Sequence, residues 1–217
     1  MNCFALSSSP LFRGLEKEEI PQALACLSAL ERSFEKGDYL LRVGQTSRSM
    51  GLVLSGLVQV EREDVWGRRL IMAALGPGQL FGESYACVGE EPLMVSVVAA
   101  EPSRVLFLDT RQLLRSPSSP CSLRDQLIAN LLTILAGKNL YLTRKIEHMS
   151  RRTIREKALS YLSFQAERAG SRTFSIPFDR QELADYLGVD RSALSAELSK
   201  MRREGLLTCQ RRQFTLL

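Results

Sequence analysis

The residues best placed for chemistry lie near the C-terminus, in residues 178–207 (FDRQELADYLGVDRSALSAELSKMRREGLL). Their pattern predicts two short helices joined by a tight turn. Asp179, with Glu182 three residues later, forms a capping box at the start of the first helix. Gly188 can adopt the positive φ that a tight corner needs, and Asp190 caps the second helix. This is the layout of a helix-turn-helix that reads DNA.

The second of these helices separates an apolar side from a polar side. Leu194, Leu198 and Met201 recur at helical spacing and predict the inward stripe. One arginine and several small residues form the outward face: Arg191, Ser192, Ser195, Ala196 and Ser199. Such a face fits a major groove and presents donors to base edges. The alternative is an ordinary pair of amphipathic helices, which the two caps, the glycine turn and a basic C-terminal region disfavour.

The charge of the chain is concentrated in that C-terminal region. Residues 151–217 contain thirteen Lys or Arg and eight Asp or Glu, an excess that equals the net charge of +5 of all 217 residues. The first 150 residues are therefore neutral overall. A basic end on a neutral body indicates that this end meets a polyanion.

The composition argues against several other classes of protein. The five cysteines are scattered without a CxxC pair, their number is odd, and His148 is the only histidine, so we expect no metal, no haem and no complete disulfide framework. The N-terminus has no basic region followed by an apolar run, so we expect no signal peptide, and the longest apolar patch, residues 127–137, is too short to span a bilayer. We therefore expect a cytoplasmic protein without a cofactor.

Short β-runs broken by glycine fill the first half of the chain. Residues 11–36 read as a helical lead-in. The following runs are residues 39–43, 51–60, 70–75, 95–99 and 105–108, with a hairpin loop at 64–69. Closely spaced short strands with glycine turns predict a β-sandwich or jelly-roll barrel.

A single long helix is expected from about residue 122 to 149. Its seam follows steps of four and three residues, as in a coiled coil: Ile128, Leu132, Leu135, Asn139, Leu142, Ile146 and Met149. The alternative is that this stripe packs onto the β-rich region. We favour a parallel homodimer, because Leu127, Leu131 and Ile134 can serve the β-rich region separately.

The segments after the long helix complete the architecture. Residues 151–167 predict a helix ended by Gly170, residues 173–176 a short strand, and residues 206–217 a terminal hairpin with its tip at 210–212. With the helix-turn-helix they make a winged helix. The fold class is α+β, with a β-roll domain at 1–120, a dimerisation helix at 121–150 and a winged helix-turn-helix at 151–217.

The order of these parts resembles one bacterial family. The motif at residues 75–83 (LGPGQLFGE), the long helix and the Asp179-Arg-Gln-Glu182 start of the helix-turn-helix resemble the cyclic-AMP receptor protein and fumarate–nitrate reductase regulator (Crp/Fnr) family of transcription factors. The resemblance covers essentially the whole chain. It implies a β-roll that binds an effector, a dimer formed by the long helices, and winged helices that effector binding reorients.

The residues at the expected effector pocket depart from those of the cyclic-AMP binders in this family. In those proteins a Gly-Glu pair, here Gly82 and Glu83, is followed by an Arg-Ser pair that grips the cyclic phosphate. The Arg-Ser positions hold Leu93 and Met94 here, and residues 82–96 contain no Lys or Arg. A buried phosphate needs a cation or several N–H donors, so we expect an effector other than cyclic AMP. The alternative is an arginine arriving from elsewhere, such as Arg69 or Arg104.

The residues that bind the other effectors of this family are also missing from the sequence. Cys3 alone cannot build the iron–sulfur site of the fumarate–nitrate regulators, and His148, expected at a surface or hinge, is remote from a haem pocket. Cys87 lies in the cassette region and is either a redox-sensing thiol or a packing residue. We expect a small organic effector in a pocket formed by Gly82, Glu83, Ser84, Tyr85, Leu93, Met94, Asn139 and Tyr141.

The resemblance also assigns roles on the DNA side. It places Arg180 and Gln181 near phosphates and Arg191 at a base edge, where a guanidinium can hold guanine O6 and N7. Ser192 stands where the family has a base-reading glutamate, and Ala196 where it has a later arginine, so we expect a different half-site. The complete DNA-contacting set is Arg180, Gln181, Arg191, Ser192, Ser195 and Ser199.

These observations predict a homodimeric, effector-gated transcription regulator, most simply an activator. Its expected partners are double-stranded DNA with an inverted repeat, a second copy of the chain, an unknown small effector and, from the family, RNA polymerase. The alternatives are a thiol-based or ligand-independent regulator of the same fold, and a cyclic-nucleotide-binding regulatory module. An enzyme is not expected, because one histidine supports no nucleophile–His–acid set and no P-loop or metal motif is present.

Overall fold

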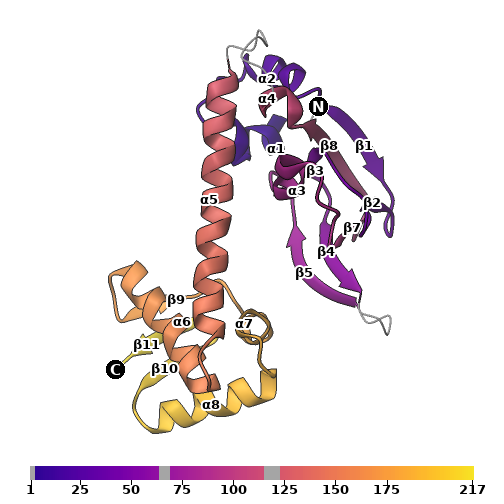
Figure 1. Ribbon diagram of the computed structural model, residues 1–217. Coiled ribbons are helices and arrows are strands. Elements are labelled where there is room, and N and C mark those ends of the chain that lie inside the picture. Colours follow the sequence, from indigo (N-terminus) through magenta and orange to yellow (C-terminus); the bar gives the residue numbers. More distant parts are fainter. Residues whose placement is uncertain (1–2, 64–68, 115–122) are drawn as a thin grey trace. The chain divides into compact units, whose positions relative to one another are not determined.

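The computed structural model describes residues 3–63, 69–114 and 123–217. Its contacts divide the chain into two compact units, Met1–Ala136 and Gly137–Leu217. Each unit has a hydrophobic core of its own. The expected loop at 64–69 and the chain break at 116–120 fall mostly or wholly outside the described residues. Figure 1 shows the β-rich first unit and the helix-rich second unit.

Two four-stranded antiparallel sheets form the framework of the first unit. The strands of one sheet are ordered β1 (Leu30–Phe34), β8 (Ser103–Asp109), β3 (Ser49–Ser55) and β6 (Leu80–Phe81). Those of the other are ordered β2 (Tyr39–Leu41), β7 (Ser96–Ala99), β4 (Val58–Glu63) and β5 (Arg69–Leu75). Apolar residues of both sheets share a buried cluster. The predicted β-roll is confirmed.

A glycine turn divides one of the predicted β-runs. The run at 51–60 is two strands, β3 and β4, separated at Gly56. Gly56 has φ +87°, and a Cβ there would lie 2.5 Å from the carbonyl oxygen of Pro102. Only glycine fits this corner, because backbone atoms cannot give way as a flexible side chain can.

The helical part of the first unit differs from the prediction. Residues 11–36 were expected to be a helical lead-in, but residues 30–34 form β1, which pairs with β8. The apolar spacing in this stretch was only loosely helical, and pairing with β8 outweighs it. The helices of this unit are α1 (Cys3–Ser8), the 3₁₀ turn η1 (Pro10–Phe12), α2 (Ile20–Cys26), α3 (Glu83–Val88) and α4 (Arg111–Leu114).

The long helix α5 (Arg124–Met149) confirms the prediction for residues 122–149, and Figure 1 shows it as one continuous helix. In the first unit, Leu127 and Leu131 are buried in the core and Ile134 packs against it. Two seam residues, Ile128 and Leu135, also pack partly against this core. The apolar surface of the helix is thus divided between the first unit and a remaining exposed stripe.

The second unit contains the expected winged helix. It begins with the end of α5 and continues through α6 (Ile154–Ala169), β9 (Thr173–Ser175), α7 (Arg180–Leu187), α8 (Arg191–Arg203), β10 (Leu207–Gln210) and β11 (Gln213–Leu216). The three strands form one antiparallel sheet in the order β10-β11-β9. The helices bury apolar faces in one core, which includes Leu162, Leu183, Leu194 and Phe214.

Local signals fix the first helix of this unit and tie it to α8. Thr153 and Glu156 form a capping box at the start of α6, and Gly170 ends the helix in a left-handed conformation. Arg155 of α6 donates from Nε to Glu197 Oε1 (2.6 Å) and forms an ion pair with Glu204 (2.8 Å). These bonds raise the pKa of Arg155, so the guanidinium stays charged and holds α6 against α8.

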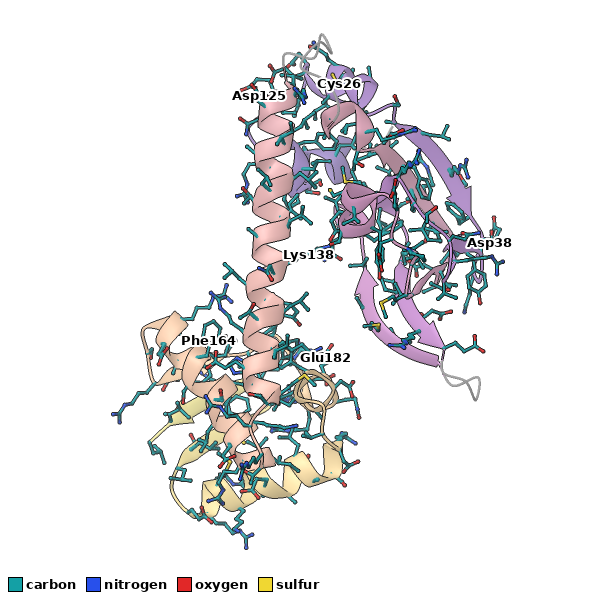
Figure 2. The ribbon with its side chains drawn as sticks, in the orientation of Figure 1. Cys26, Asp38, Asp125, Lys138, Phe164 and Glu182 are labelled. Atoms are coloured by element: carbon teal, nitrogen blue, oxygen red, sulfur yellow. The ribbon has the colours of Figure 1, made fainter. Side chains whose placement is uncertain are left out.

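His148 lies in the interior of the second unit, which corrects the expectation of a surface or hinge residue. Its side chain is 3% exposed, and Nδ1 lies 2.9 Å from Ser160 Oγ. The ring contacts Tyr161, Phe164 and Tyr186 at centroid distances of 5.8, 5.9 and 6.2 Å. Figure 2 labels Phe164 on α6. The end of α5 therefore packs into the winged helix through a histidine among aromatic rings.

Burial of His148 predicts a loss of stability in acid. Burial lowers the pKa of its imidazole below 6.5, aided by Arg151 and Arg144 and opposed by Glu147. The folded chain keeps the ring neutral, whereas the unfolded chain takes up a proton below about pH 6.5. The stabilisation is complete above that pH and declines below it, by up to about 1.4 kcal/mol per pH unit, until the folded pKa is reached.

Urea unfolding followed by tyrosine near-ultraviolet circular dichroism, from about pH 7.5 to about pH 5.5, measures this effect. The variant His148→Phe keeps an aromatic ring and should lose this part of the slope. Equal pH dependence in both proteins would show that His148 does not carry it.

None of the helices in the described parts of the chain is both long enough and apolar enough to cross a membrane.

Candidate nucleic-acid interface and effector site

The helix-turn-helix has the caps that the sequence predicts. Asp179 accepts a bond from the amide of Glu182 (2.9 Å), and the Glu182 carboxylate accepts one from the amide of Asp179 (2.6 Å). Figure 2 labels Glu182 at the start of α7. Asp190 accepts from the amide of Ala193 (2.8 Å) and caps α8. Both helices therefore begin at positions fixed by side-chain bonds.

The turn between α7 and α8 depends on Gly188, which has φ +62°. A Cβ at this position would lie 2.8 Å from Met149 Cε, at the end of a flexible side chain. Gly205 has φ +73°, and a Cβ added there would meet nothing within 4 Å. Comparing alanine substitutions at the two glycines therefore separates the cost of backbone strain from the cost of crowding.

We expect Gly188→Ala and Gly205→Ala each to lower the free energy of unfolding by about 1–2 kcal/mol, because both residues are left-handed. Gly188→Ala should cost slightly more, since Met149 must also move. Urea unfolding of the two variants and the parent chain measures both values. An unchanged free energy in Gly188→Ala would refute the need for glycine at the turn.

The two faces of α8 are arranged as predicted. Leu194, Leu198 and Met201 are 0–2% exposed and belong to the core of the second unit. Arg191, Ser192 and Ser199 are exposed, while Ser195 is half-buried.

Hydrogen bonds within the motif occupy two of the three serine hydroxyls of this outward face. Ser192 donates to the Asp190 carboxylate, and Ser199 donates to the carbonyl of Ser195 (2.8 Å). The side chain of Arg191 has no hydrogen-bond or ion-pair partner within the described ranges. Its guanidinium is therefore the charged donor on this face that can turn to a base edge without breaking an existing bond.

The start of α7 supplies a second basic group beside the hairpin. Arg180 lies over the ring of Phe214 (5.7 Å), and its Nη2 is 3.8 Å from Cys209 Sγ. Gln181 donates to Asp185 (2.9 Å) and is exposed. The packing of Arg180 against β10 and β11 holds a cation at the position expected to meet a phosphate.

Two further arginines, which are not in the predicted DNA-contacting set, lie beside Arg180. Arg211 and Arg212 form the tip of the β10–β11 hairpin and line a cavity of about 480 Å³ with Asp179 and Arg180. Arg212 also pairs with Glu182 (3.4 Å). The sequence signal was a basic pair at the tip of a predicted hairpin. Together with Arg180 these residues form a cationic edge that suits phosphates.

In the first unit, the glycine turn of the expected effector cassette is present. Gly82 has φ +70° and precedes α3, whose first residue, Glu83, is 4% exposed. Ser84 is exposed, and the Tyr85 hydroxyl accepts a bond from the amide of Met94 (3.3 Å). This bond joins α3 to the segment that carries Leu93 and Met94.

Leu93 is a core residue here. Its side chain is 2% exposed and packs in the cluster that includes Phe81 and Tyr85, whereas Met94 is 59% exposed. The backbone of Leu93 is bonded on both sides, from its amide to the Gln45 carbonyl and from the Gly44 amide to its carbonyl (both 2.8 Å). The position that grips phosphate in the resembling proteins is therefore filled by an apolar side chain.

The remaining expected effector residues lie in another unit or are engaged elsewhere. Asn139 and Tyr141 belong to the second unit, where Tyr141 contacts Tyr186 at 6.0 Å. Arg104, one alternative source of a cation, donates from Nε to Glu31 (2.7 Å). The side chain of Arg69 lies outside the described side chains. Within the first unit, a hydrogen bond and a shared apolar cluster join Tyr85 to the segment that carries Leu93 and Met94.

Exposed apolar residues remain along the expected dimer seam. Leu132, Leu142 and Ile146 are 61%, 54% and 67% exposed, and Met149 is 38% exposed. Asn139 is also exposed. A row of exposed large apolar side chains at seam spacing is typical of a helix that packs against a partner.

The cysteine side chains that the structure describes fall into two states. Cys26 is disulfide-bonded, whereas Cys87 and Cys209 are half-buried free thiols. Burial raises the pKa of the Cys87 thiol, and nearby Glu83 raises it further. In the described residues, no three His, Cys, Asp or Glu side chains gather closely enough to hold a metal ion.

Two family models match the chain. The cyclic nucleotide-binding domain matches residues 31–116, and the Crp-like helix-turn-helix domain matches residues 156–217. These ranges correspond to the β-roll and the winged helix.

Relatives match across both parts. The cyclic AMP receptor protein of Thermus thermophilus is 30% identical over 207 residues, covering 93% of this chain and 89% of the relative. The transcriptional activator protein FnrL of Cereibacter sphaeroides is 24% identical and covers 90% and 80%. The crystal structure of Thermus thermophilus catabolite activator protein matches with a TM-score of 0.50 at 27% identity, covering 96% and 94%. The chain therefore belongs to the Crp/Fnr family of DNA-binding transcription regulators.

Proposed function

We propose that this chain is a homodimeric transcription regulator that binds an inverted-repeat DNA site and responds to a small effector other than cyclic AMP. We further propose that it acts in the cytoplasm as an activator, with RNA polymerase as a partner. The observation that carries the proposal is Arg191, exposed and unpaired within the described residues on a capped helix whose opposite face is buried.

The cationic edge of the second unit supports DNA as the ligand. Arg180, Arg211 and Arg212 line one cavity beside the start of α7. Phosphate contacts from such residues position a protein on DNA, while base contacts supply specificity. Arg191 is the residue we assign to base contact, and this edge is the part we assign to the phosphates.

The exposed seam of α5 supports a homodimer. Leu142 and Ile146 are more than half exposed, although the same helix buries Leu127 and Leu131 in the first unit. A second copy would cover the exposed stripe by a symmetric contact. Two winged helices related by a two-fold axis read half-sites about one helical turn apart.

The buried Leu93 supports an effector other than cyclic AMP. A phosphate in the cassette would face an apolar side chain where a guanidinium is needed, and an uncompensated charge there is costly. The Thermus relative is named as a cyclic AMP receptor protein, so its name alone would favour the opposite assignment. We base the assignment on the residues of this chain.

Two alternative regulators of the same fold, a thiol-based sensor and a ligand-independent regulator, differ from this proposal in what they require. A thiol switch at Cys87 is disfavoured by its raised pKa, because the reactive form of a cysteine is the thiolate. Ligand-independent binding requires full DNA affinity in the purified chain. A cyclic-nucleotide-binding module that does not bind DNA is disfavoured, because it would not account for the capped helix-turn-helix.

Calorimetric titration of the purified chain with cyclic AMP tests the effector assignment. We expect no saturable heat, whereas micromolar binding would restore cyclic AMP as the effector. Transcription in vitro from a template carrying the selected DNA site tests the sign of regulation. An increase in transcript on adding the chain supports activation, and a decrease overturns it.

A further inference from the structure

A buried side chain connects the end of the long helix α5 to the winged helix. His148 lies on the last turn of α5, and its partners come from α6 and α7 of the same unit. Ser160 Oγ lies 2.9 Å from Nδ1, and the rings of Tyr161, Phe164 and Tyr186 pack against the imidazole. Since α5 carries the proposed dimer seam and the winged helix the proposed DNA contacts, this junction links the two.

The second ring nitrogen of His148 is not hydrogen-bonded. Nε2 is buried, and no partner for it is present among the described residues. The hydroxyl of Tyr161, whose ring contacts the imidazole, is also buried without a partner. A protonated ring would place a positive charge and an N–H donor where no acceptor is available. The site therefore accommodates the neutral imidazole and disfavours the imidazolium.

The charged groups on α5 and on the turn after it do not favour a positive charge at this ring. Arg144 and Arg151 oppose protonation of the imidazole, and Glu147 favours it. Arg151 lies 3.6 Å from the Glu147 carboxylate, so this acid is already matched by a cation. Lys145 adds a positive charge over the ring of Tyr186, at 5.5 Å from the centroid.

The groups that face the ring from α6 and α7 supply no acceptor for a second N–H. Glu156 and Glu167 of α6 line the open cavity beside the ring, but neither bonds to Nε2. Tyr161 of α6 and Tyr186 of α7 have hydroxyls whose pKa is raised by burial, so both stay neutral. Arg168 of α6 adds a positive charge near Tyr161. A proton on the imidazole is therefore poorly compensated by all three helices.

We propose that His148 is a positioning residue for DNA binding, and that it makes the DNA affinity of the proposed dimer fall in acid. The neutral ring holds the winged helix on the end of α5, whereas the protonated ring leaves its buried site and frees the winged helix to turn. Two freed winged helices are no longer pre-oriented for both half-sites, so binding to the full inverted repeat weakens. This inference rests on the proposed function and adds a consequence for DNA binding to the loss of stability expected in acid.

The direction of this change distinguishes it from an ordinary effect of charge. A proton taken up by the chain raises its positive charge, which by itself strengthens the attraction to DNA. Release of the winged helix weakens binding instead. His148 is the only histidine of the chain, and histidine is the side chain that ordinarily titrates between about pH 5 and 8. Because burial lowers the pKa of His148 below 6.5, the affinity should be constant above that pH and decline below it.

Fluorescence anisotropy at constant salt, with a duplex carrying the inverted repeat selected from random DNA, tests the proposal. We expect the affinity to fall about fivefold or more from about pH 7.5 to about pH 5.5, with an upper limit of about tenfold per chain for each pH unit below 6.5. A duplex carrying a single half-site should lose much less, because one winged helix needs no fixed orientation to its partner. His148→Phe keeps an aromatic ring but takes up no proton, so its affinity for the full site should not change with pH.

Ser163→His in the His148→Phe background is the matched control. Ser163 is exposed on α6 beside the same cavity, so the new imidazole titrates in water and the affinity should again not fall in acid. Unchanged or tighter binding by the parent chain in acid, or an equal decline in His148→Phe, would overturn the proposal. A decline that follows the loss of far-ultraviolet circular dichroism would also overturn it, because it would report unfolding.

The same titration separates this inference from the proposed function. Sequence-specific binding by the parent chain at the upper pH limit, together with a flat pH profile, would overturn the role of His148 alone. No binding at that limit would overturn the proposed function and, with it, this inference.

Discussion

Replacing Arg191 by glutamine should weaken sequence discrimination at one base pair of each half-site while leaving general DNA affinity largely in place. The Arg191 guanidinium is exposed and unpaired within the described residues, whereas the hydroxyls of Ser192 and Ser199 already donate hydrogen bonds within the motif. A bidentate arginine–guanine contact contributes about 1–3 kcal/mol of discrimination, so each half-site should lose about 5- to 150-fold.

Fluorescence anisotropy with a selected site and a scrambled duplex of equal length measures this loss. Arg180→Gln is the informative comparison, because a phosphate contact should weaken both duplexes alike and reduce the salt slope by about 1. Arg168→Gln, on α6 and outside the helix-turn-helix, controls for net charge. Retained discrimination in Arg191→Gln would remove Arg191 from base contact.

Placing a glutamate at Leu142 should convert the proposed dimer into monomers. Leu142 is at a seam position and 54% exposed in the single chain. In a symmetric parallel dimer the two glutamates would face each other in an apolar seam, where desolvation and like charge both oppose association. DNA affinity should then fall by about 100-fold or more, because the two half-sites no longer act together.

Leu140→Glu is the matched control for this variant. Leu140 is equally exposed, at 54%, but lies outside the seam. Sedimentation equilibrium should show a dimer for the parent chain and Leu140→Glu, and a monomer for Leu142→Glu. A dimer in all three proteins would place the interface elsewhere.

The sequence predicted the parts of the fold whose signals are local. The capping box at Asp179 and the glycines at the ends of α6 and α7, Gly170 and Gly188, are all in place. These features depend on residues within one helical turn of each other, and their chemistry specifies them regardless of the rest of the chain. The capping box at Thr153 marks a helix start about three residues later than expected.

Features set by packing between distant segments were harder to predict. Loosely spaced leucines suggested a helix through residues 30–34, but pairing with residues 103–107 makes this segment a strand. His148 carried no local sign of burial, because its neighbours Ser160, Phe164 and Tyr186 come from other helices. Tertiary context decided the position of both segments.

The candidate effector region shows the same limit. The absence of an Arg-Ser pair at Leu93 and Met94 was evident from the sequence, and the burial of Leu93 agrees with it. A cavity of the first unit that is lined by Glu61 and Arg42 was not foreseen, because its walls come from three separate segments.

Selection from a pool of random double-stranded DNA tests the central claim most directly. The purified chain is incubated with the pool, bound duplexes are recovered over several rounds, and the enriched sequences are read. We predict an inverted repeat whose half-sites are centred about one helical turn apart, with a guanine at the position lost in Arg191→Gln. Enrichment of no sequence, or of single half-sites without a symmetric partner, would contradict the account of a dimeric, sequence-specific regulator.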